Sequence, residues 1–293
     1  MLSILIPTYN YNVYPLVEEL HRQANDLNCV FEVLVYDDAS PRSVIENQKI
    51  DNLSNCNYKI LPKNIGRSAI RNLLAKDATY ENLLFLDADV TVFNDDFIKN
   101  YLEIITFKKY EVVYGGIIYQ EKMPSSNQLL RWIYGNEREA LTAQKRTVDP
   151  YVAFLTLNFL IKKSIFDKVS FDENIPNLRY EDLLFSYHLK QQKIKTEHID
   201  NQVIHDGIET SEVFLNKTDD SLKGLKYLLD HELLPYEYAK ISRIYTLLKK
   251  TGLHQLVKKE HQLLKNIYIK NLLSESPSLF IYDIYRLGHL LNL

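Results

Sequence analysis

The 293-residue sequence predicts an α/β fold with an open sheet, followed by a helical C-terminal extension. Three short apolar runs end in polar or acidic residues and show no alternation, as is typical of parallel strands covered on both faces. From residue 211 onward, Leu, Tyr and Ile recur at intervals of three and four residues, the spacing of helices. We therefore expect an α/β domain over residues 1–210 and a helical extension over residues 211–293. The three apolar runs are Ser3–Pro7, Phe31–Tyr36 and Leu83–Leu86.

Two helices are expected between these strands, because apolar residues there recur at helical spacing. The β-α-β-α-β order indicates a sheet that binds ligands at the carboxyl ends of its strands. Further strands are expected at Val112–Tyr119 and Ala153–Ile161, and a helix within Asn127–Gln144. The two apolar stripes are Val13, Leu16, Val17, Leu20 and Ala24, and Ile65, Ala69, Ile70, Leu73 and Leu74.

Composition excludes several classes of protein. Hydrophobic residues make up 46% and charged residues 25%, with only 8 Gly and 9 Pro, so collagen-like and broadly disordered chains are excluded. The net charge of -3 argues against nucleic acid as a partner. Cys29 and Cys56 are too few for a disulfide framework, which suits the cytoplasm. The N-terminus lacks a basic, signal-like start, and no apolar run approaches the roughly 20 residues of a membrane span.

A pair of acids follows the second predicted strand. Asp37 and Asp38 lie where side chains of a parallel sheet face the crevice that binds cofactors, and they can accept hydrogen bonds from a base or from ribose hydroxyls. The alternative is a helix N-cap, because Asp and Ser after a strand often cap the next helix. The sequence is compatible with both interpretations.

A second pair of acids, Asp87 and Asp89, follows the third predicted strand. Side chains alternate along an extended chain, so the two carboxylates are expected on the same side, where they can act on one cation. Hard divalent ions such as Mg²⁺ and Mn²⁺ bind a few carboxylates and complete their coordination with phosphate oxygens and water. The pair therefore predicts a divalent cation, Mn²⁺ or Mg²⁺, with a nucleotide diphosphate as its partner.

Eight short motifs follow one another over about residues 3–207. They are PTYN (7–10), VYDDAS (35–40), NIGR (64–67), AIRN (69–72), LDAD (86–89), NFLIKK (158–163), FDE (171–173) and YED (180–182). This ordered series resembles the inverting glycosyltransferases of family 2, and the resemblance rests on the order of the motifs, because each one alone is short. It implies the GT-A fold, a Rossmann-like open mixed sheet found in nucleotide-diphospho-sugar transferases.

The resemblance also assigns a nucleotide site. It implies that one of Asp37 and Asp38 accepts a hydrogen bond from the base, that Asp87 and Asp89 are the ribose and metal acids, and that Arg67 or Arg71 lies beside the nucleotide. Gly66 fits this site, since glycine permits close approach and a helix N-terminus favours anions. Solvated surface charge is the alternative for the two arginines. The first motif contributes Pro7, Thr8, Tyr9 and Asn10 to the nucleoside site.

The resemblance places catalysis in the YED motif. Asp182, beside Glu181, matches the catalytic base, which must lie near the acceptor hydroxyl and opposite the leaving nucleotide. A helix cap or a partner of the helix dipole is the structural alternative for these acids. His205 follows an apolar stretch and, by a looser resemblance, is a third metal or diphosphate ligand. A lone histidine is more often structural.

Residues 240–270 carry eight basic side chains and one acid, a net charge of +7 that leaves -10 on the rest of the chain. Nine apolar residues alternate with them at helical spacing. An ordinary helix that packs its apolar face on the catalytic domain explains this pattern most simply. Peripheral contact with the inner face of the cell membrane is the alternative hypothesis, since a basic amphipathic helix can lie on anionic lipid.

We therefore predict a metal-dependent, inverting glycosyltransferase. Its expected donor is a nucleotide-diphosphate sugar: a UDP-sugar by default, with dTDP- and GDP-sugars as alternatives. Its expected acceptor is a hydroxyl of a glycan or of a lipid-linked acceptor, in bacterial surface polysaccharide synthesis. One alternative is a phosphatase of the haloacid dehalogenase type, whose DxDxT motif also fits Asp87 to Thr91. That motif normally opens its domain, whereas two strands precede it here. A second alternative is a nucleotidyltransferase, but the glycine-rich N-terminal loop usual in that class is absent from this sequence. A third is a non-catalytic relative that binds sugar nucleotides.

Overall fold

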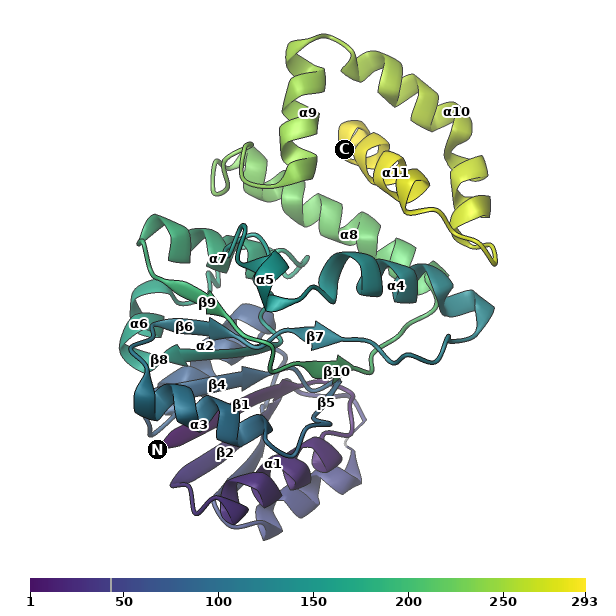
Figure 1. The fold of residues 1–293 in the computed structure, drawn as a ribbon. Helices are drawn as coiled ribbons and strands as arrows, with labels where there is room; N and C mark the ends of the chain where they lie inside the picture. The colour runs from purple at the N-terminus through teal and green to yellow at the C-terminus, as the bar shows by residue number, and fades with distance from the viewer. Residues whose placement is uncertain (43) are drawn as a thin grey trace. The chain divides into compact units, whose positions relative to one another are not determined.

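The computed structural model describes residues 1–42 and 44–293, and the chain forms two compact units (Figure 1). The α/β unit comprises Met1–Ile118, Ala140–Asn174 and Glu181–Gly207. The helical unit comprises Tyr119–Glu139, Ile175–Tyr180 and Ile208–Leu293. The helical unit thus includes two short segments that precede the predicted boundary near residue 210.

A seven-stranded mixed sheet with the order β3-β2-β1-β4-β8-β6-β9 forms the centre of the α/β unit. The three predicted strands are confirmed as β1, β2 and β4, and β1 pairs in parallel with the other two. Strand β8 is antiparallel to both of its neighbours. The strands are β1 Leu2–Thr8, β2 Phe31–Asp37, β3 Cys56–Ile60, β4 Asn82–Leu86, β6 Val112–Tyr114, β8 Asn158–Lys162 and β9 Thr196–His198.

A second, three-stranded sheet has the order β5-β10-β7. Its strands are β5 (Val90–Thr91), β7 (Ile117–Ile118) and β10 (Val203–His205). Strand β10 is antiparallel to β5 and parallel to β7. This sheet therefore brings the chain after residue 200 next to the residues that follow β4.

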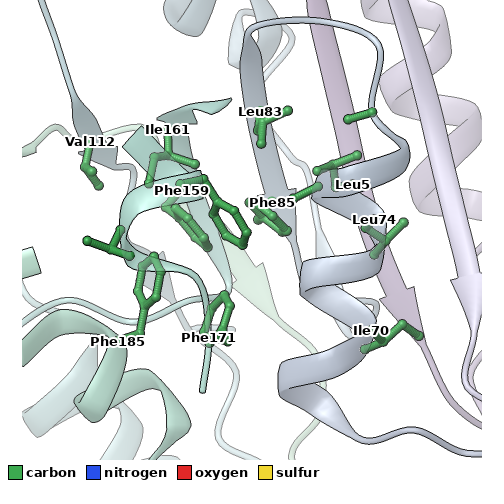
Figure 2. Close-up of a cluster of buried hydrophobic side chains, with 14 of the residues drawn as sticks. Leu5, Ile70, Leu74, Leu83, Phe85, Val112, Phe159, Ile161, Phe171 and Phe185 are labelled. Carbon is green, nitrogen blue, oxygen red and sulfur yellow. The ribbon is translucent and has the colours of Figure 1, made fainter. Parts of the chain in front are cut away.

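Helices flank the sheet of the α/β unit, and the two predicted apolar stripes are confirmed as α1 and α2. Buried side chains from α2, the central strands and α7 form one core, which Figure 2 shows around Leu5, Phe85, Phe159 and Phe185. The rings of Phe85 and Phe159 stack with centroids 4.8 Å apart. The helices are α1 Tyr14–Asp26, α2 Arg67–Asp77, α3 Phe97–Phe107, α5 Ala143–Arg146, α6 Lys163–Val169 and α7 Glu181–Gln191, with a 3₁₀ helix over Ile45–Asn52.

The strand predicted over Val112–Tyr119 is wrong as one element, because the chain breaks between β6 and β7 at two glycines. Gly116 has φ +92°, which is unfavourable for residues with a Cβ. A Cβ at Gly115 would lie 2.3 Å from the hydroxyl of Tyr101. The close packing at this point therefore requires glycine and interrupts the strand.

The strand predicted over Ala153–Ile161 begins only at Asn158, and the preceding residues form turns. Phe154 in that segment is nevertheless buried and packs on Phe159, with ring centroids 5.2 Å apart. The apolar run thus reflects burial as well as strand structure. Strand β3 was not expected from the sequence, because only Tyr58 in it is buried and its apolar signal is correspondingly weak.

The helical unit confirms the helices expected after residue 211. Helix α11 contacts α4, α8, α9 and α10, and its tyrosines Tyr282 and Tyr285 are buried in the core of the unit. The helix expected within Asn127–Gln144 is confirmed as α4, which continues as a π-helical segment over Gly135–Glu139. Over residues 1–42 and 44–293, no helix has both the length and the apolar character needed to cross a membrane. The helices are α4 Leu129–Tyr134, α8 Ser211–Asp230, α9 Lys240–Lys250, α10 His254–Leu272 and α11 Leu279–Asn292.

Candidate active site

Asp89 and His205 come together although they are distant in sequence. Pairing of β5 with β10 sets His205 opposite Val90, and the His205 Nε2 atom lies 3.7 Å from the Asp89 Oδ2 atom. A Cβ at Gly207 would lie 2.4 Å from the same oxygen, so this glycine leaves room for the carboxylate. The small sheet therefore assembles two of the three predicted metal ligands.

Asp87 has a different partner from Asp89. The extended alternation predicted for the two acids is wrong, because β4 ends at Leu86 and a turn follows at Ala88 and Asp89. Asp87 Oδ1 accepts a hydrogen bond of 2.8 Å from Arg71. The structure thus pairs Asp87 with an arginine and Asp89 with a histidine.

The donor set at Asp89 and His205 suits a small hard cation. In the described ranges, no three His, Cys, Asp or Glu side chains are arranged to hold a metal ion. A carboxylate oxygen and an imidazole nitrogen nevertheless suit Mn²⁺, and Mg²⁺ typically keeps few protein ligands and takes the rest from phosphate and water. The residues present therefore fit an ion that is bound jointly with a diphosphate.

Arg71 joins the acid after β4 to the acid at the start of α7. Its guanidinium lies 2.8 Å from Asp87 and 3.5 Å from Glu181, and its side chain is only 6% exposed. Burial opposes the positive charge, but the carboxylates of Asp87 and Glu181 outweigh it and raise the pKa of Arg71. The ring of Phe171 lies 5.4 Å from the guanidinium. Arg71 is thus a buried cation between two acids.

The other predicted arginine, Arg67, is exposed in the first turn of α2. The structure therefore distinguishes two residues that sequence spacing placed on the same helix face. Arg67 lowers the pKa of Asp182 through its charge, whereas Arg71 makes direct contacts with acids.

Asp182 lies in the first turn of α7, where its Oδ1 accepts a hydrogen bond of 2.7 Å from the amide of Leu183. Burial, and then the negative charge of Glu181, raise its pKa to about 6. The Leu183 amide and the charges of Arg71 and Arg67 act in the opposite direction. A carboxylate with this pKa is ionised at neutral pH and is more basic than an ordinary aspartate, which suits a general base.

The backbone just before α7 is unusual. Arg179 and Tyr180 have φ +75° and +69°, a region that costs non-glycine residues about 1–3 kcal/mol each. Within the helical unit, the Tyr180 hydroxyl accepts a hydrogen bond of 3.1 Å from Arg286 on α11. A Cβ at Gly224 on α8 would lie 2.9 Å from the carbonyl oxygen of Arg179. Both contacts lie within the helical unit, to which Arg179 and Tyr180 belong, and the chain continues from Tyr180 into Glu181.

Asp37 and Asp38 are both buried and both accept hydrogen bonds from the protein. Asp37 accepts from the Ser40 amide at 2.7 Å and from the Tyr58 hydroxyl at 2.9 Å. Asp38 accepts from the amides of Ile65 at 2.7 Å and Gly66 at 3.0 Å, ahead of α2. These bonds give both acids a role in shaping the loops after β2 and β3. Contact of either acid with a base stays a prediction.

The PTYN motif ends β1 and opens the loop that follows it. Pro7 and Thr8 are the last residues of the strand, and Tyr9 and Asn10 are exposed. The Asn10 amide donates to the Ser40 hydroxyl at 2.8 Å, which joins this loop to the loop after β2. Gly66, with φ +85°, precedes the first turn of α2. The predicted nucleoside residues thus lie at the carboxyl ends of adjacent parallel strands.

Sequence reasoning missed two residues that the structure adds to the site. Burial raises the pKa of the Tyr11 hydroxyl, and the charges of Asp89 and then Asp206 raise it further. Asn72 donates to the Phe171 carbonyl at 2.8 Å and to Glu173 at 2.7 Å, which ties α2 to the FDE motif. Asn72 is the last residue of the AIRN motif and Tyr11 directly follows PTYN, but neither residue type by itself indicates a role in a site.

Comparison with known proteins identifies the family of this arrangement. The model of the family described as Glycosyl transferase family 2 matches residues 3–170. No curated protein sequence matches the chain. The family match covers β1, β2, β4 and β8 and ends before the YED motif.

Solved structures share the fold. Mannosyl-3-phosphoglycerate synthase from Rubrobacter xylanophilus is 14% identical with a TM-score of 0.56, covering 80% of this chain and 76% of its own. S. aureus TarS 1-349 in complex with UDP-GlcNAc is 17% identical with a TM-score of 0.53, covering 98% and 90%. Mannosyltransferase PcManGT from Pyrobaculum calidifontis, in complex with GDP-Man and Mn²⁺, is 13% identical with a TM-score of 0.52, covering 78% and 64%. The chain spans 54% of a longer TarS chain. At these identities the likeness shows the fold alone.

Proposed function

The chain belongs to glycosyl transferase family 2, and we propose that it is an inverting glycosyltransferase that uses a nucleotide-diphosphate sugar and a divalent cation. A single observation carries this proposal. Buried Arg71 joins Asp87, at the carboxyl end of the sheet, to Glu181, the neighbour of an aspartate whose pKa is raised to about 6. The candidate nucleotide site and the candidate base are therefore linked by one cation.

The proposed reaction forms one bond and breaks another at the anomeric carbon of the sugar. Asp182 accepts the proton of the acceptor hydroxyl as that oxygen attacks, and the nucleoside diphosphate leaves from the opposite face with the electrons of its bond to the sugar. Asp89 and His205 would hold the divalent ion, which stabilises the negative charge of the leaving diphosphate. Glu181, held by Arg71, keeps Asp182 basic through its charge.

The donor is proposed as a UDP-sugar, with dTDP- and GDP-sugars as the other candidates, because two structures of the same fold are complexes with UDP-GlcNAc and GDP-Man. The acceptor is proposed as a hydroxyl of a glycan or a lipid-linked glycan of a bacterial surface polysaccharide. A screen of nucleotide sugars with Mn²⁺ or Mg²⁺, with release of the nucleoside diphosphate as readout, tests the proposal. Cleavage of simple phosphomonoesters would instead support the phosphatase alternative. Donor binding without any turnover across glycan acceptors would support the non-catalytic relative.

Replacing Asp89 is expected to remove the dependence of donor binding on metal. In the native protein, addition of Mn²⁺ should strengthen binding of the nucleoside diphosphate at least about tenfold. In Asp89→Ala the cation loses its carboxylate ligand, so Mn²⁺ should no longer strengthen this binding. Calorimetric titration with and without Mn²⁺ measures this. Asp167→Ala, at an exposed aspartate on α6, is the matched control. An unchanged Mn²⁺ effect in Asp89→Ala would exclude Asp89 as a ligand.

The rate of transfer should depend on the protonation of Asp182. Because burial and Glu181 raise its pKa to about 6, the turnover number should be constant above about pH 7 and fall about tenfold per pH unit below about pH 6. An aspartate with the ordinary pKa would keep its activity to about pH 4. The measurement is the pH profile of turnover at saturating donor, with donor binding followed at each pH. A flat profile between pH 5 and 7 would contradict the assignment.

A further inference from the structure

Most apolar residues that the sequence pattern picked out in the basic segment lie outside the core of the helical unit. None of the nine is fully buried, and Leu264 is partly buried against that core. Six have exposed fractions from 37% to 71%. We call these six the aliphatic face: Ile244, Leu247, Leu253, Leu256, Leu263 and Ile267.

Helices α9 and α10 bury other residues instead. Helix α10 buries His261, Tyr268 and Leu272, and the ring of His261 lies 5.5 Å from that of Tyr285 on α11. A Cβ at Gly288 would lie 2.4 Å from the His261 ring, so α10 and α11 are closely packed there. Helix α9 buries Ser242 and Tyr245. Both helices therefore pack inward through residues that do not belong to the aliphatic face.

The exposed residues of α10 share one side of the helix. Leu256, Leu263 and Ile267 are seven and four residues apart, a spacing that aligns them on a single face. At 3.6 residues per turn, Tyr268 and Leu272 point well away from this face. The exposed residues therefore form a continuous stripe and are not scattered, and contiguous apolar surface of this kind marks an interaction site.

Basic side chains surround the stripe. Eight of them lie in residues 240–270 against the single acid Glu260, and none of the eight forms an ion pair with an acid anywhere in the described parts of the chain. Six are exposed, and the remaining two, Lys258 and Lys265, are partly exposed. The six are Lys240, Arg243, Lys249, Lys250, Lys259 and Lys270. Positive charge without acidic partners, next to exposed aliphatic side chains, is complementary to a surface whose outer layer is anionic and whose interior is apolar.

We propose that the aliphatic face, with the basic side chains around it, docks on an anionic lipid surface. The aliphatic side chains insert at the boundary of the acyl chains, while the long stems of the lysines carry their charges to the headgroups. A second copy of the chain suits this face less well, because pairing would bring two segments of charge +7 together. This proposal goes beyond the proposed sugar transfer, and its test needs neither donor nor acceptor.

Co-sedimentation of the full chain with vesicles tests the proposal. Vesicles that contain phosphatidylglycerol should bind the protein, vesicles of phosphatidylcholine alone should not, and added salt should release it. Each cation near the headgroups strengthens binding about fivefold, so Lys249→Gln/Lys250→Gln/Lys259→Gln should weaken it about 100-fold. Leu256→Ser/Leu263→Ser/Ile267→Ser keeps every cation but should abolish binding at physiological salt, where screened charge alone does not hold the protein on the vesicles.

A matched variant separates the aliphatic face from exposed apolar residues in general. Ile45→Ser/Phe107→Ser/Val148→Ser removes three strongly exposed apolar side chains of the α/β unit and should bind vesicles like the native protein. Absence of binding to anionic vesicles would overturn the proposal, as would full binding by the Leu256/Leu263/Ile267 variant. A dimer in light scattering that the same three substitutions dissolve would assign the face to a second copy and overturn the lipid assignment. Vesicle binding is measured without donor or acceptor, so its outcome does not depend on whether the protein transfers sugar.

Discussion

Asp182→Asn should lower the rate of sugar transfer by about 10²–10⁴-fold and leave the affinity for the nucleotide-sugar donor unchanged. The amide cannot accept the acceptor proton, but its oxygen can still receive the hydrogen bond from the Leu183 amide. The geometry at the start of α7 should therefore persist. Single-turnover kinetics together with donor titration measure the two quantities separately. Native transfer rates in this variant would remove Asp182 as the base.

The same substitution should stabilise the protein at neutral and higher pH. The folded-state pKa of Asp182, about 6, exceeds the ordinary value, so folding favours the protonated form, and the ionised form costs stability as pH rises through about 6. The neutral asparagine side chain mimics the protonated acid. A gain of at most about 3 kcal/mol is expected near pH 8, and none near pH 4. Asp167→Asn, at an exposed position, should change neither activity nor this pH dependence. If Asp182 had only a structural role, its replacement would not both lower the transfer rate and raise the free energy of unfolding.

Arg71→Met should destabilise the fold by about 3 kcal/mol, because it leaves Asp87 and Glu181 as neighbouring, largely desolvated acids without their cation. Donor binding should weaken at the same time, since Asp87 loses the group that orients it. Urea denaturation followed by circular dichroism measures the free energy of unfolding. Restoring part of that energy in Arg71→Met/Glu181→Gln would confirm that the loss comes from the uncompensated charge.

Arg22→Met is the matched control for this change. Arg22 also contacts several acids, at 2.7 Å to Glu19 and 2.7 Å to Asp95, but its side chain is 47% exposed. Exposed pairs contribute at most about 1 kcal/mol, so this variant should stay close to the native stability. Equal losses from both variants would show that burial of Arg71 has no special importance.

The sequence predicted those strands of the α/β unit that are buried on both faces and those helices that are buried along one side. The runs at β1, β2 and β4 are apolar because both faces of the sheet are covered, and α1 and α2 carry stripes at helical spacing. The same signal failed at Phe154, which is buried outside any strand, and at β3, where only Tyr58 is buried. Apolar content reports burial, and it indicates a strand only where regular structure and burial coincide.

The acids of the candidate site could be found in the sequence, but their partners could not. Asp87 and Asp89 stand one residue apart, yet the turn after β4 gives them different partners, Arg71 and His205. His205 reaches Asp89 through the pairing of β10 with β5, and such pairing depends on contacts distant along the chain. The positions of Tyr11 and Asn72 were hidden for the same reason.

Short-range patterns determined the fold class, the helical extension and the identity of the acids, because periodicity and residue type are local properties of the chain. Tertiary structure alone decided that Arg71 is buried while Arg67 is exposed, although both lie on one helix face, because burial depends on what packs against that face. It also decided the pKa of Asp182, since desolvation and the charge of a held neighbour set that value. The basic tail shows the same division: its amphipathic pattern is local, whereas the exposure of its leucines depends on the inward packing of α9 and α10.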